Sequence, residues 1–506
     1  MEAPDLNGNA QHDLARIARD PLLFVEHVFG ANLWSAQKDI LRSVARNART
    51  AVKACHASGK TMLAALAVLW WLARYEDGTA ITTAPTWEQV RDLLWGEIHK
   101  ALRRGRIRDI GTVNQTEIRI GPDHYAIGLA TNRGVRFQGF HGGHVLIVMD
   151  EAPGVQGDIW EAVEGVRAGG KVHVLALGNP TIASGPFHDA FTANRDGWAT
   201  FTIDAFDSPN LQGMSLEDLR ALPRRLPEDS PEFAIRPRPY LVTRRWAYEK
   251  FREWGEKSPL WQARVRGQFP EQAEDALISL AWLEGARAKK EEVNPKSRLY
   301  AGIDVAGPGE DETCAVVRDD RGAIIAMASW QGQDPRGDVC AFLAGFRDRL
   351  EDVNVDSIGI GYNFGLHLED QGFPVVLINV GEASREPEKF ANAKAEFYWG
   401  LRMRFEAGDV SGLDDETSIS QLAGIRYRHN PRGQIQIESK ENSRKRGVKS
   451  PDRAEATMLA FANRTPGIIE YYRDLSARAE GGPVAEEDGD ELIKVYEECL
   501  KRYSRS

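Results

Sequence analysis

The stretch Lys53-Ala-Cys-His-Ala-Ser-Gly-Lys-Thr61 has the residue types and the spacing to hold the phosphates of a nucleotide. It lies between a strand-like run and a helix-like apolar run. Gly59 allows the backbone to come close to a phosphate, while backbone N–H groups and the helix N-terminus face the anion. Lys60 would reach the β- and γ-phosphates, and the Thr61 hydroxyl would hold Mg²⁺. The spacing therefore predicts a P-loop.

Two further residues of this stretch, Lys53 and Ser58, are also expected to contact the nucleotide. The pattern departs from the usual P-loop at its first position, where Ala54 stands in place of glycine. A Gly-Lys-Thr triplet alone recurs by chance, so the assignment needs a second part of the same site.

An apolar run that ends in two acids supplies this second part. Val145-Leu-Ile-Val-Met-Asp-Glu-Ala152 is typical of a buried parallel strand with Asp150 and Glu151 at its C-terminal edge. Asp150 would hold the Mg²⁺ shell, and Glu151 would polarise the attacking water. The alternative is a buried strand that happens to stop at two solvated acids.

Three more features extend the same core. The apolar strand-like run 172–181 ends in polar groups, among them Asn179, that could sense the γ-phosphate, and 80–86 resembles another strand. Such alternating elements predict an α/β nucleoside triphosphatase core, a parallel sheet with helices on both faces. Gln37 precedes the P-loop, and its amide could bind an adenine edge, which favours ATP. The alternative for Gln37 is an ordinary surface residue at the start of a helix.

A second group of acids begins at Asp304, which lies inside the apolar strand-like run 299–307. Asp356 lies in 355–361, which resembles another strand and turn, and Asp452 follows Ser-Pro at the start of a helix. A strand with a central acid, a meander and later acids at a strand end and a helix start resemble the ribonuclease-H-like nuclease fold. Asp356 could also be a turn acid, and an acid at position 452 is favoured by the helix dipole in any case.

Carboxylate oxygens are the ligands that hard cations such as Mg²⁺ and Mn²⁺ prefer. Two such cations, about 3.5–4 Å apart, can activate a water and stabilise the leaving 3′-oxygen of a DNA strand. We assign Asp304, Asp356 and Asp452 to this metal site.

A chain of 506 residues is longer than the usual size of a domain with one hydrophobic core, so we expect more than one domain. We expect a P-loop ATPase domain at 1–205, a lid or linker subdomain at 206–297, a ribonuclease-H-like nuclease domain at 298–466 and a C-terminal tail at 467–506. The tail includes an acidic run that would dock a partner or stay disordered.

The net charge of −10 argues against a protein that coats nucleic acid without specificity, but it leaves room for a local basic groove. Basic patches occur at 103–108 and 440–449, and each could be a DNA contact or simply a solvated face. The four cysteines have no paired spacing, so neither a disulfide framework nor a zinc site is implied and we expect a cytosolic protein. We also see neither a signal peptide nor a membrane-spanning run.

The order of these parts resembles the large terminase subunit of tailed bacteriophages. The most specific matching pieces are Met149-Asp-Glu-Ala152, Gly178-Asn-Pro-Thr181 and the stretch from Lys440 to Ala456. The resemblance implies a motor that uses ATP and Mg²⁺ to pump double-stranded DNA into a procapsid through a portal protein. It also implies a nuclease, in which Mn²⁺ could replace Mg²⁺, that cuts concatemeric DNA at the start and end of packaging. The resemblance further implies a small terminase subunit as a partner and a homo-oligomeric ring. It places the protein in the host cytoplasm, transiently docked on the procapsid, and implies no association with a membrane.

By the same resemblance, Lys60 and Thr61 take the P-loop roles, Glu151 is the catalytic glutamate, and the three aspartates bind metal. The family ring also needs an arginine that reaches a neighbour's ATP, for which Arg136 is the first candidate and Arg133 the second. Glu455 stands where related sequences often have Asp, so its part in metal binding is open.

Two other functions remain open from the sequence. One is an ATP-driven helicase or repair nuclease of another class, against which the absence of a second helicase-like core in the C-terminal half argues. The other is an assembly factor without enzymatic activity, whose ATP site only switches binding. The presence of Lys60, Asp150 and Glu151 argues against the second, and an ATP-hydrolysis assay would decide it.

Overall fold

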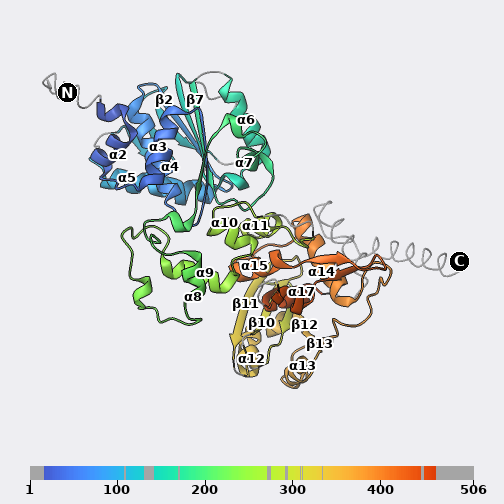
Figure 1. Cartoon of the computed structure of the whole chain (residues 1–506). Helices are drawn as coiled ribbons and strands as arrows, with labels where there is room; N and C mark the ends of the chain where they lie inside the picture. The colour runs from blue at the N-terminus through green and yellow to red at the C-terminus, as the bar shows by residue number, and fades with distance from the viewer. Residues whose placement is uncertain are drawn as a thin grey trace, which may run out of the picture.

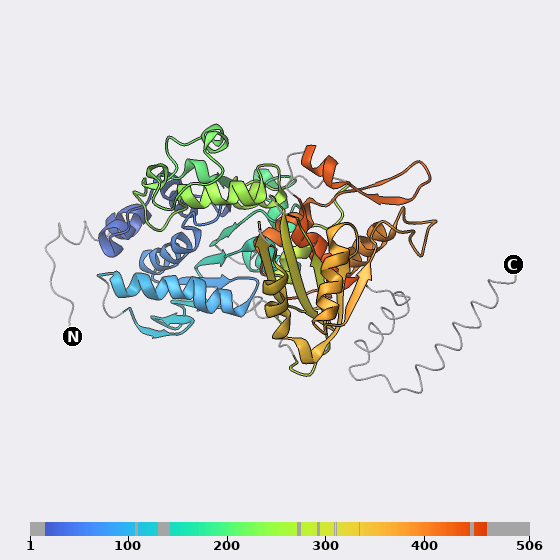
Figure 2. The ribbon, with the colours of Figure 1, turned by 90° about the horizontal axis from the view of Figure 1, so that it is seen from below.

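The computed structural model describes residues 16–106, 110–129, 142–168, 171–270, 275–290, 294–307, 309, 311–332, 334–445 and 450–462. Two sheets dominate it, an eight-stranded sheet in the N-terminal half and a five-stranded sheet in the C-terminal half. Figure 1 shows them in separate parts of the molecule, and Figures 1 and 2 both show a segment of short helices, drawn in green, lying along these parts. The predicted α/β architecture is confirmed.

The N-terminal sheet has the order β3-β4-β5-β2-β6-β7-β1-β8. Its six strands from β5 to β8 in this order run parallel, and β3 and β4 add an antiparallel edge. The strands are β1 (Arg49–Ala54), β2 (Gly78–Thr83), β3 (Thr112–Asn114), β4 (Glu117–Arg119), β5 (Tyr125–Gly128), β6 (His144–Met149), β7 (Lys171–Gly178) and β8 (Ala199–Ile203). Because β6 and β7 are covered on both faces, their sequences are nearly continuous apolar runs.

Helices cover both faces of this sheet (Figure 1). Because β6, β7 and β1 are parallel neighbours, their carboxyl ends meet at one edge. The helices are α2 (Pro21–Phe29), α3 (Ser35–Arg46), α4 (Lys60–Arg74), α5 (Trp95–Arg104), α6 (Gly157–Arg167) and α7 (Gly185–Asp189). Helix α4 is apolar nearly all round because it packs between the sheet and its neighbours, and it carries the buried pair Trp70 and Trp71.

Short, well-capped helices form the segment between the sheets. They are α8 (Leu216–Ala221), α9 (Arg244–Trp254), α10 (Pro259–Arg264) and α11 (Leu280–Ala288). The side chains of Ser215, Thr243, Ser258 and Ser279 each accept a backbone N–H at the start of one of these helices, which satisfies donors that the first helical turn leaves free.

The C-terminal sheet has the order β11-β10-β9-β12-β13. Strands β11, β10 and β9 are antiparallel neighbours, while β9, β12 and β13 run parallel. Their bounds are β9 (Leu299–Asp304), β10 (Glu312–Asp319), β11 (Ile324–Gln331), β12 (Leu350–Asp356) and β13 (Val375–Ile378). This combination of a meander with parallel strands beside β9 is the ribonuclease-H-like order that the sequence predicted.

Helix α17 (Asp452–Phe461) packs against β9 and β10. It comes so close at Gly302 that an added Cβ would lie 2.1 Å from the backbone nitrogen of Ala460, so only glycine fits there. The remaining elements are α12 (Arg336–Ala344), α13 (Ile360–Asp370), α14 (Ala393–Ala407), α15 (Glu416–Gly424), α16 (Lys440–Lys445) and the hairpin of β14 (Tyr427–His429) and β15 (Ile435–Ile437).

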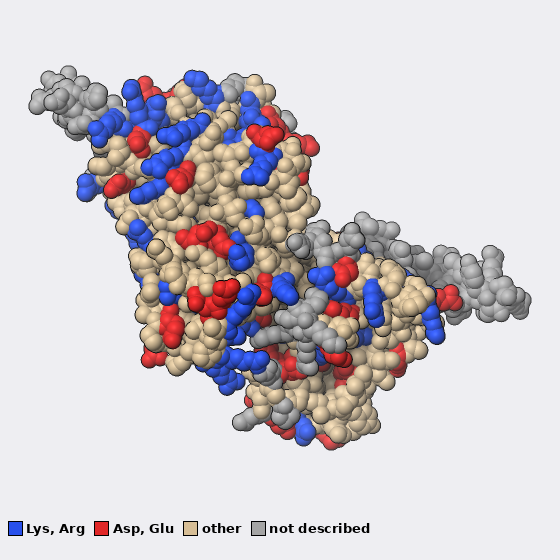
Figure 3. Space-filling view, in the orientation of Figure 1, with Lys and Arg blue, Asp and Glu red and all other residues tan. Residues whose placement is uncertain are grey.

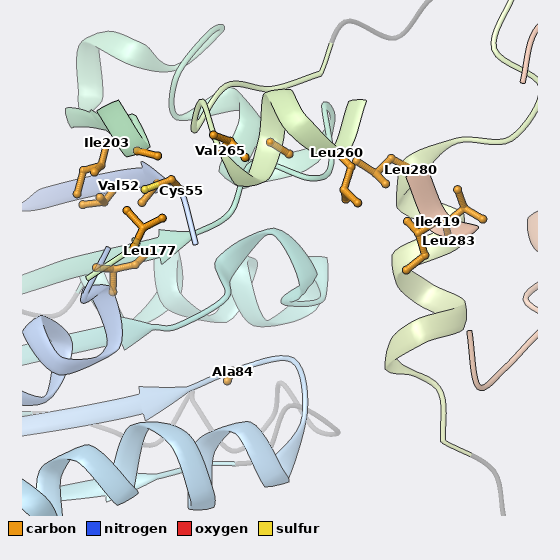
Figure 4. Close-up of a cluster of buried hydrophobic side chains, with 14 of the residues drawn as sticks. Val52, Cys55, Ala84, Leu177, Ile203, Leu260, Val265, Leu280, Leu283 and Ile419 are labelled. Atoms are coloured by element: carbon orange, nitrogen blue, oxygen red, sulfur yellow. The ribbon is translucent and has the colours of Figure 1, made fainter. Parts of the chain in front are cut away.

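One hydrophobic cluster runs from the N-terminal sheet through the middle segment into the C-terminal half. Figure 4 shows Val52 and Ile203 from the sheet, Leu260 and Val265 from around α10, and Ile419 from α15 as members of this cluster. Within the described residues, no helix combines the length and the apolar character needed to cross a membrane.

Candidate active sites

The predicted P-loop connects the end of β1 to the start of α4. Gly59 caps α4 with φ of 78°, a left-handed conformation that favours glycine. A Cβ at this position would also lie 2.4 Å from Nε2 of Gln37. Within the described part of the chain, the buried hydroxyl of Ser58 has no hydrogen-bond partner. A free buried hydroxyl and a helix N-terminus fit the phosphate that the sequence predicted here.

The amine of Lys60 joins three elements of the site. Its Nζ lies 3.0 Å from Oε1 of Glu151 and donates to Oδ1 of Asn179 at 3.2 Å. Asn179 in turn donates through Nδ2 to the carbonyl of Ala54 at 2.6 Å. Burial lowers the pKa of Lys60, but the charges of Glu151 and Asp150 outweigh this effect and the pKa is raised. The P-loop, the two acids and the strand end are thus held together at one edge of the sheet.

Asp150 is buried and directly follows β6. Burial and the charge of Glu151 raise its pKa to about 6, and a hydrogen bond with the Thr61 side chain acts in the opposite direction. The sequence predicted that these two side chains share a Mg²⁺ ion, and the structure places them in contact.

Backbone strain also marks this site. In the described ranges only two non-glycine residues have positive φ, Ala57 at 48° and Glu151 at 49°. One lies in the P-loop and the other is the predicted catalytic glutamate. Strained backbone of this kind is kept where the surrounding structure over-determines it, which is common at functional sites.

The structure gives Gln37 a contact that the sequence did not predict. Its buried amide donates from Nε2 to the carbonyls of Ser58 and Gly59 at 3.3 and 3.5 Å, so it stabilises the backbone of the P-loop. Contact with adenine stays a prediction.

Lys53 also has partners outside the loop. Its Nζ donates to Oε1 of Gln268 at 2.6 Å and lies 5.6 and 5.3 Å from the ring centres of Phe191 and Phe269. Its predicted contact with the nucleotide is not tested. Arg136 and Arg133, the candidates for the trans-acting arginine, lie outside the described residues.

The acids of the C-terminal half lie on neighbouring elements. Asp304 ends β9, Asp356 ends the adjacent parallel strand β12, and Asp452 begins α17, which packs on β9. Oδ2 of Asp452 accepts the backbone N–H of Glu312 at 3.0 Å, and Oδ1 of Asp356 accepts that of Ile358 at 3.0 Å. The fold therefore brings three acids that are distant in sequence to one end of the sheet.

Lys440 lies between two of these acids. Its Nζ is 3.4 Å from Oδ2 of Asp304 and 3.4 Å from Oδ1 of Asp452. Burial raises the pKa of Asp304 to about 7 although the Lys440 charge lowers it, and burial also raises the pKa of Asp356. The two carboxylates share one cationic group, which shows that this position suits positive charge.

Glu455 is buried one helical turn after Asp452, and its Oε1 lies 2.6 Å from Nζ of Lys394. In the described ranges no three Asp, Glu, His or Cys side chains converge closely enough to hold one metal ion. The donor chemistry of Asp304, Asp356 and Asp452 suits a divalent cation, but their assignment as metal ligands stays a prediction.

In the sequence Lys440 belongs to a basic patch, and nothing in that patch predicted its contact with Asp304 and Asp452. The signal available was the position of Lys440, since a lysine twelve residues before an expected ligand lies inside the most family-like stretch. The contact of Asn179 with Lys60 was also not predicted, although the polar ending of β7 could have indicated it.

No protein-family model matches the chain. A probable terminase large subunit of Enterobacteria phage P7 is 26% identical over 359 residues, which are 65% of this chain and 65% of that protein's length.

Three solved structures are also similar. The large terminase of bacteriophage HK97 matches 88% of this chain and 99% of its own at 15% identity and a TM-score of 0.37. The nuclease domain of the large terminase subunit of bacterial virus Sf6 matches 38% and 100% at 18% identity and a TM-score of 0.33. The large terminase nuclease of thermophilic phage G20c with bound magnesium matches 37% and 97% at 21% identity and a TM-score of 0.29. The resemblance stated from the sequence is confirmed: this chain is similar to the large terminase subunits of tailed bacteriophages.

Proposed function

We propose that the chain is the large subunit of a viral DNA-packaging enzyme, with an ATPase in its N-terminal half and a metal-dependent DNA endonuclease in its C-terminal half. The observation that carries the proposal is the meeting of Lys60 with both Glu151 and Asn179 beside the P-loop. Glu151 follows β6, which is separated from β1 by one strand, β7. A P-loop lysine that contacts an acid at this place is positioned for phosphoryl chemistry.

In the ATPase, Lys60 would offset the charge of the β- and γ-phosphates, and Ser58 and the backbone N–H groups at Gly59 would bind them. Thr61 and Asp150 would hold Mg²⁺, which supplies charge neutralisation between the phosphates when bound. Glu151 would orient the attacking water. On ATP binding, Lys60 would exchange its contact with Glu151 for a phosphate oxygen, which frees the carboxylate.

In the nuclease, Asp304, Asp356 and Asp452 would hold divalent cations, Mg²⁺ or Mn²⁺, that activate water and stabilise the leaving oxygen. Lys440 would give up its place between Asp304 and Asp452 or turn toward the DNA phosphate. Glu455 is held by Lys394, so we assign it to supporting this site rather than to binding metal.

The same proposal covers the wider role. The chain would drive double-stranded DNA through a portal protein into a procapsid, act with a small terminase subunit, form a ring on the procapsid, and work in the host cytoplasm. Support for these parts comes from the likeness to the phage P7 protein, which is a probable terminase large subunit.

An ATP-hydrolysis assay tests the first half of the proposal. Lys60→Ala should abolish hydrolysis, and Glu151→Gln should keep ATP binding while turnover falls by about 10²–10⁴-fold, the usual contribution of such a group. Glu164→Gln, on the surface of α6, is the matched control and should leave the rate unchanged. Turnover by the Glu151→Gln variant at the control rate would remove Glu151 from this role.

A further inference from the structure

Two adjoining cavities lie at the edge of the N-terminal sheet opposite the P-loop. The first has a volume of about 540 Å³ and lies among the start of α2 and the C-terminal ends of α3 and α4. The second, of about 480 Å³, lies at the N-terminal ends of β6 and β7, and the two share Arg74 and Tyr75 as lining residues. We call the two together the basic groove.

Arginine dominates the lining of the first cavity, with Arg16, Arg19, Arg42, Arg46 and Arg74. Arg167 and Lys171 continue the positive charge along the second cavity. Figure 3 shows Lys and Arg side chains gathered over the upper part of the N-terminal half, although the chain as a whole has a net charge of −10. This concentration of one sign of charge points to an anionic partner.

Acids offset little of this charge. Arg42 pairs with Asp39 at 3.1 Å, and Arg167 pairs with Glu164. In the described ranges, no Asp or Glu pairs with Arg16, Arg19 or Arg46.

The remaining contacts in the groove leave it with a net positive charge. Asp20 caps α2, where its carboxylate accepts the backbone N–H groups of Leu22 and Leu23, and it brings one negative charge to a cavity lined by five arginines. Arg74 lies against the ring of Tyr75, 4.7 Å from its centre, an arrangement that holds the guanidinium in place without neutralising it.

The length of the basic groove favours a chain of phosphates over a single small anion. A single phosphate or a small nucleotide would need one cavity, whereas two adjoining cavities with basic residues along both suit a chain of regularly spaced charges. Guanidinium groups bind phosphate through two parallel hydrogen bonds, so arginine is the residue that best suits a phosphodiester backbone. We propose that the basic groove binds the backbone phosphates of double-stranded DNA, at a site separate from the nuclease acids. The choice of DNA over an acidic peptide rests on the proposed function.

The test compares DNA binding by the whole chain and by the triple variant Arg19→Gln, Arg46→Gln, Arg74→Gln. Binding of a short fluorescent duplex is measured by anisotropy over a range of salt concentrations, with EDTA present to prevent cleavage. Each lost phosphate contact should reduce the slope of log K against log salt by about 1, so the triple variant should lose up to about 3. Its affinity at low salt should fall about 10-fold or more.

The control variant removes the same charge elsewhere, by Arg220→Gln, Lys290→Gln and Arg336→Gln. Each of these residues is exposed and paired with an acid outside the groove. It should keep the wild-type slope and affinity. Both variants should hydrolyse ATP without DNA at the wild-type rate, because the groove lies at the far edge of the sheet from Lys60; this also shows that they are folded.

The outcomes separate the proposals. If the wild-type chain binds no DNA, the proposed function fails. If it binds DNA and the triple variant matches it in slope and affinity, the groove is not a DNA site and this inference is overturned. If the triple variant keeps DNA binding but loses binding of a polyglutamate peptide, the groove serves an acidic protein instead, which also overturns it.

Discussion

The side-chain amine of Lys440 lies 3.4 Å from Oδ2 of Asp304, the acid that ends the central strand of the C-terminal sheet. The same amine is 3.4 Å from Asp452. A buried carboxylate is costly without a compensating charge, and here one ammonium group compensates two of them. Lys440 therefore occupies the position where the proposed nuclease site suits a cation.

This relationship predicts how stability depends on divalent metal. Lys440→Met should lower the melting temperature by several degrees in EDTA, because Asp304 and Asp452 lose their shared cation. Adding Mn²⁺ should raise the melting temperature of the variant more than that of the wild-type chain, because metal restores positive charge between the acids. Thermal unfolding with and without Mn²⁺ measures both effects.

Lys290→Met is the matched control, since Lys290 is 74% exposed and its pair with Asp414 lies on the surface. It should change neither the melting temperature nor the response to Mn²⁺ appreciably. An equal Mn²⁺ response in the Lys440 variant and the wild type would show that the acids do not bind metal where Lys440 now lies.

A second prediction concerns pH and the P-loop residue His56. Burial lowers its pKa well below the ordinary value, and the charges of Arg264 and Lys60 act in the same direction. Its Nε2 is buried without a hydrogen-bond partner in the described part of the chain. The folded state therefore holds His56 neutral, whereas the unfolded chain takes up a proton near pH 6.5.

The sign of the effect follows from this difference. Because the folded pKa is depressed, the contribution of His56 to stability is fully present above about pH 6.5 and is lost as the pH falls below it. Wild type should lose about 1.4 kcal/mol more unfolding free energy than His56→Gln between pH 7.5 and 5.5. Denaturant unfolding at the two pH values checks this. Equal losses in the two proteins would mean that His56 titrates normally in the fold.

A third prediction concerns Arg264, which joins the middle segment to both halves of the molecule. Its carbonyl accepts the backbone N–H of His56 at 2.8 Å, and its guanidinium contacts Glu284 at 2.7 Å and Glu416 at 2.5 Å. Only 2% of its side chain is exposed. Arg264→Met should cost about 1.5–3 kcal/mol of unfolding free energy, because the half-buried carboxylates of Glu284 and Glu416 lose their hydrogen bonds to the buried guanidinium.

Arg245→Met provides the comparison, because Arg245 also contacts two glutamates but lies on the surface. Its cost should stay within about 1 kcal/mol. Similar losses in the two variants, measured by chemical unfolding, would contradict the view that the Arg264 cluster fastens the middle segment in place.

Much of this fold could be predicted because its strands are buried on both faces. The runs that became β6 and β7 are apolar almost throughout, and each ends in polar residues at the same edge of a parallel sheet. The P-loop was predictable because Gly59, Lys60 and Thr61 follow one another between a strand-like and a helix-like run, and Gly59 has the positive φ that favours glycine. Strand β13 and helix α15 were not predicted, because each is short and takes its stability from packing on neighbours rather than from its own pattern.

Contacts between side chains that are far apart in the sequence could not be predicted. The contact of Lys440 with Asp304 spans 136 positions, and the contact of Lys60 with Asn179 spans 119. The basic groove was missed for the same reason, because Arg19, Arg46 and Arg74 are isolated in the sequence and only the packing of three helix ends brings them together.

The most direct test of the central claim, that one chain holds two separate active sites, is a crossed assay on Asp304→Asn and Glu151→Gln in the whole chain. Plasmid cleavage in Mn²⁺ and ATP hydrolysis are measured for both variants. Asp304→Asn should abolish cleavage and keep ATP hydrolysis, because the P-loop would hold its own Mg²⁺ at the edge of the other sheet, while Glu151→Gln should lose hydrolysis and still cut the plasmid. Cleavage by Asp304→Asn at the wild-type rate would contradict the account.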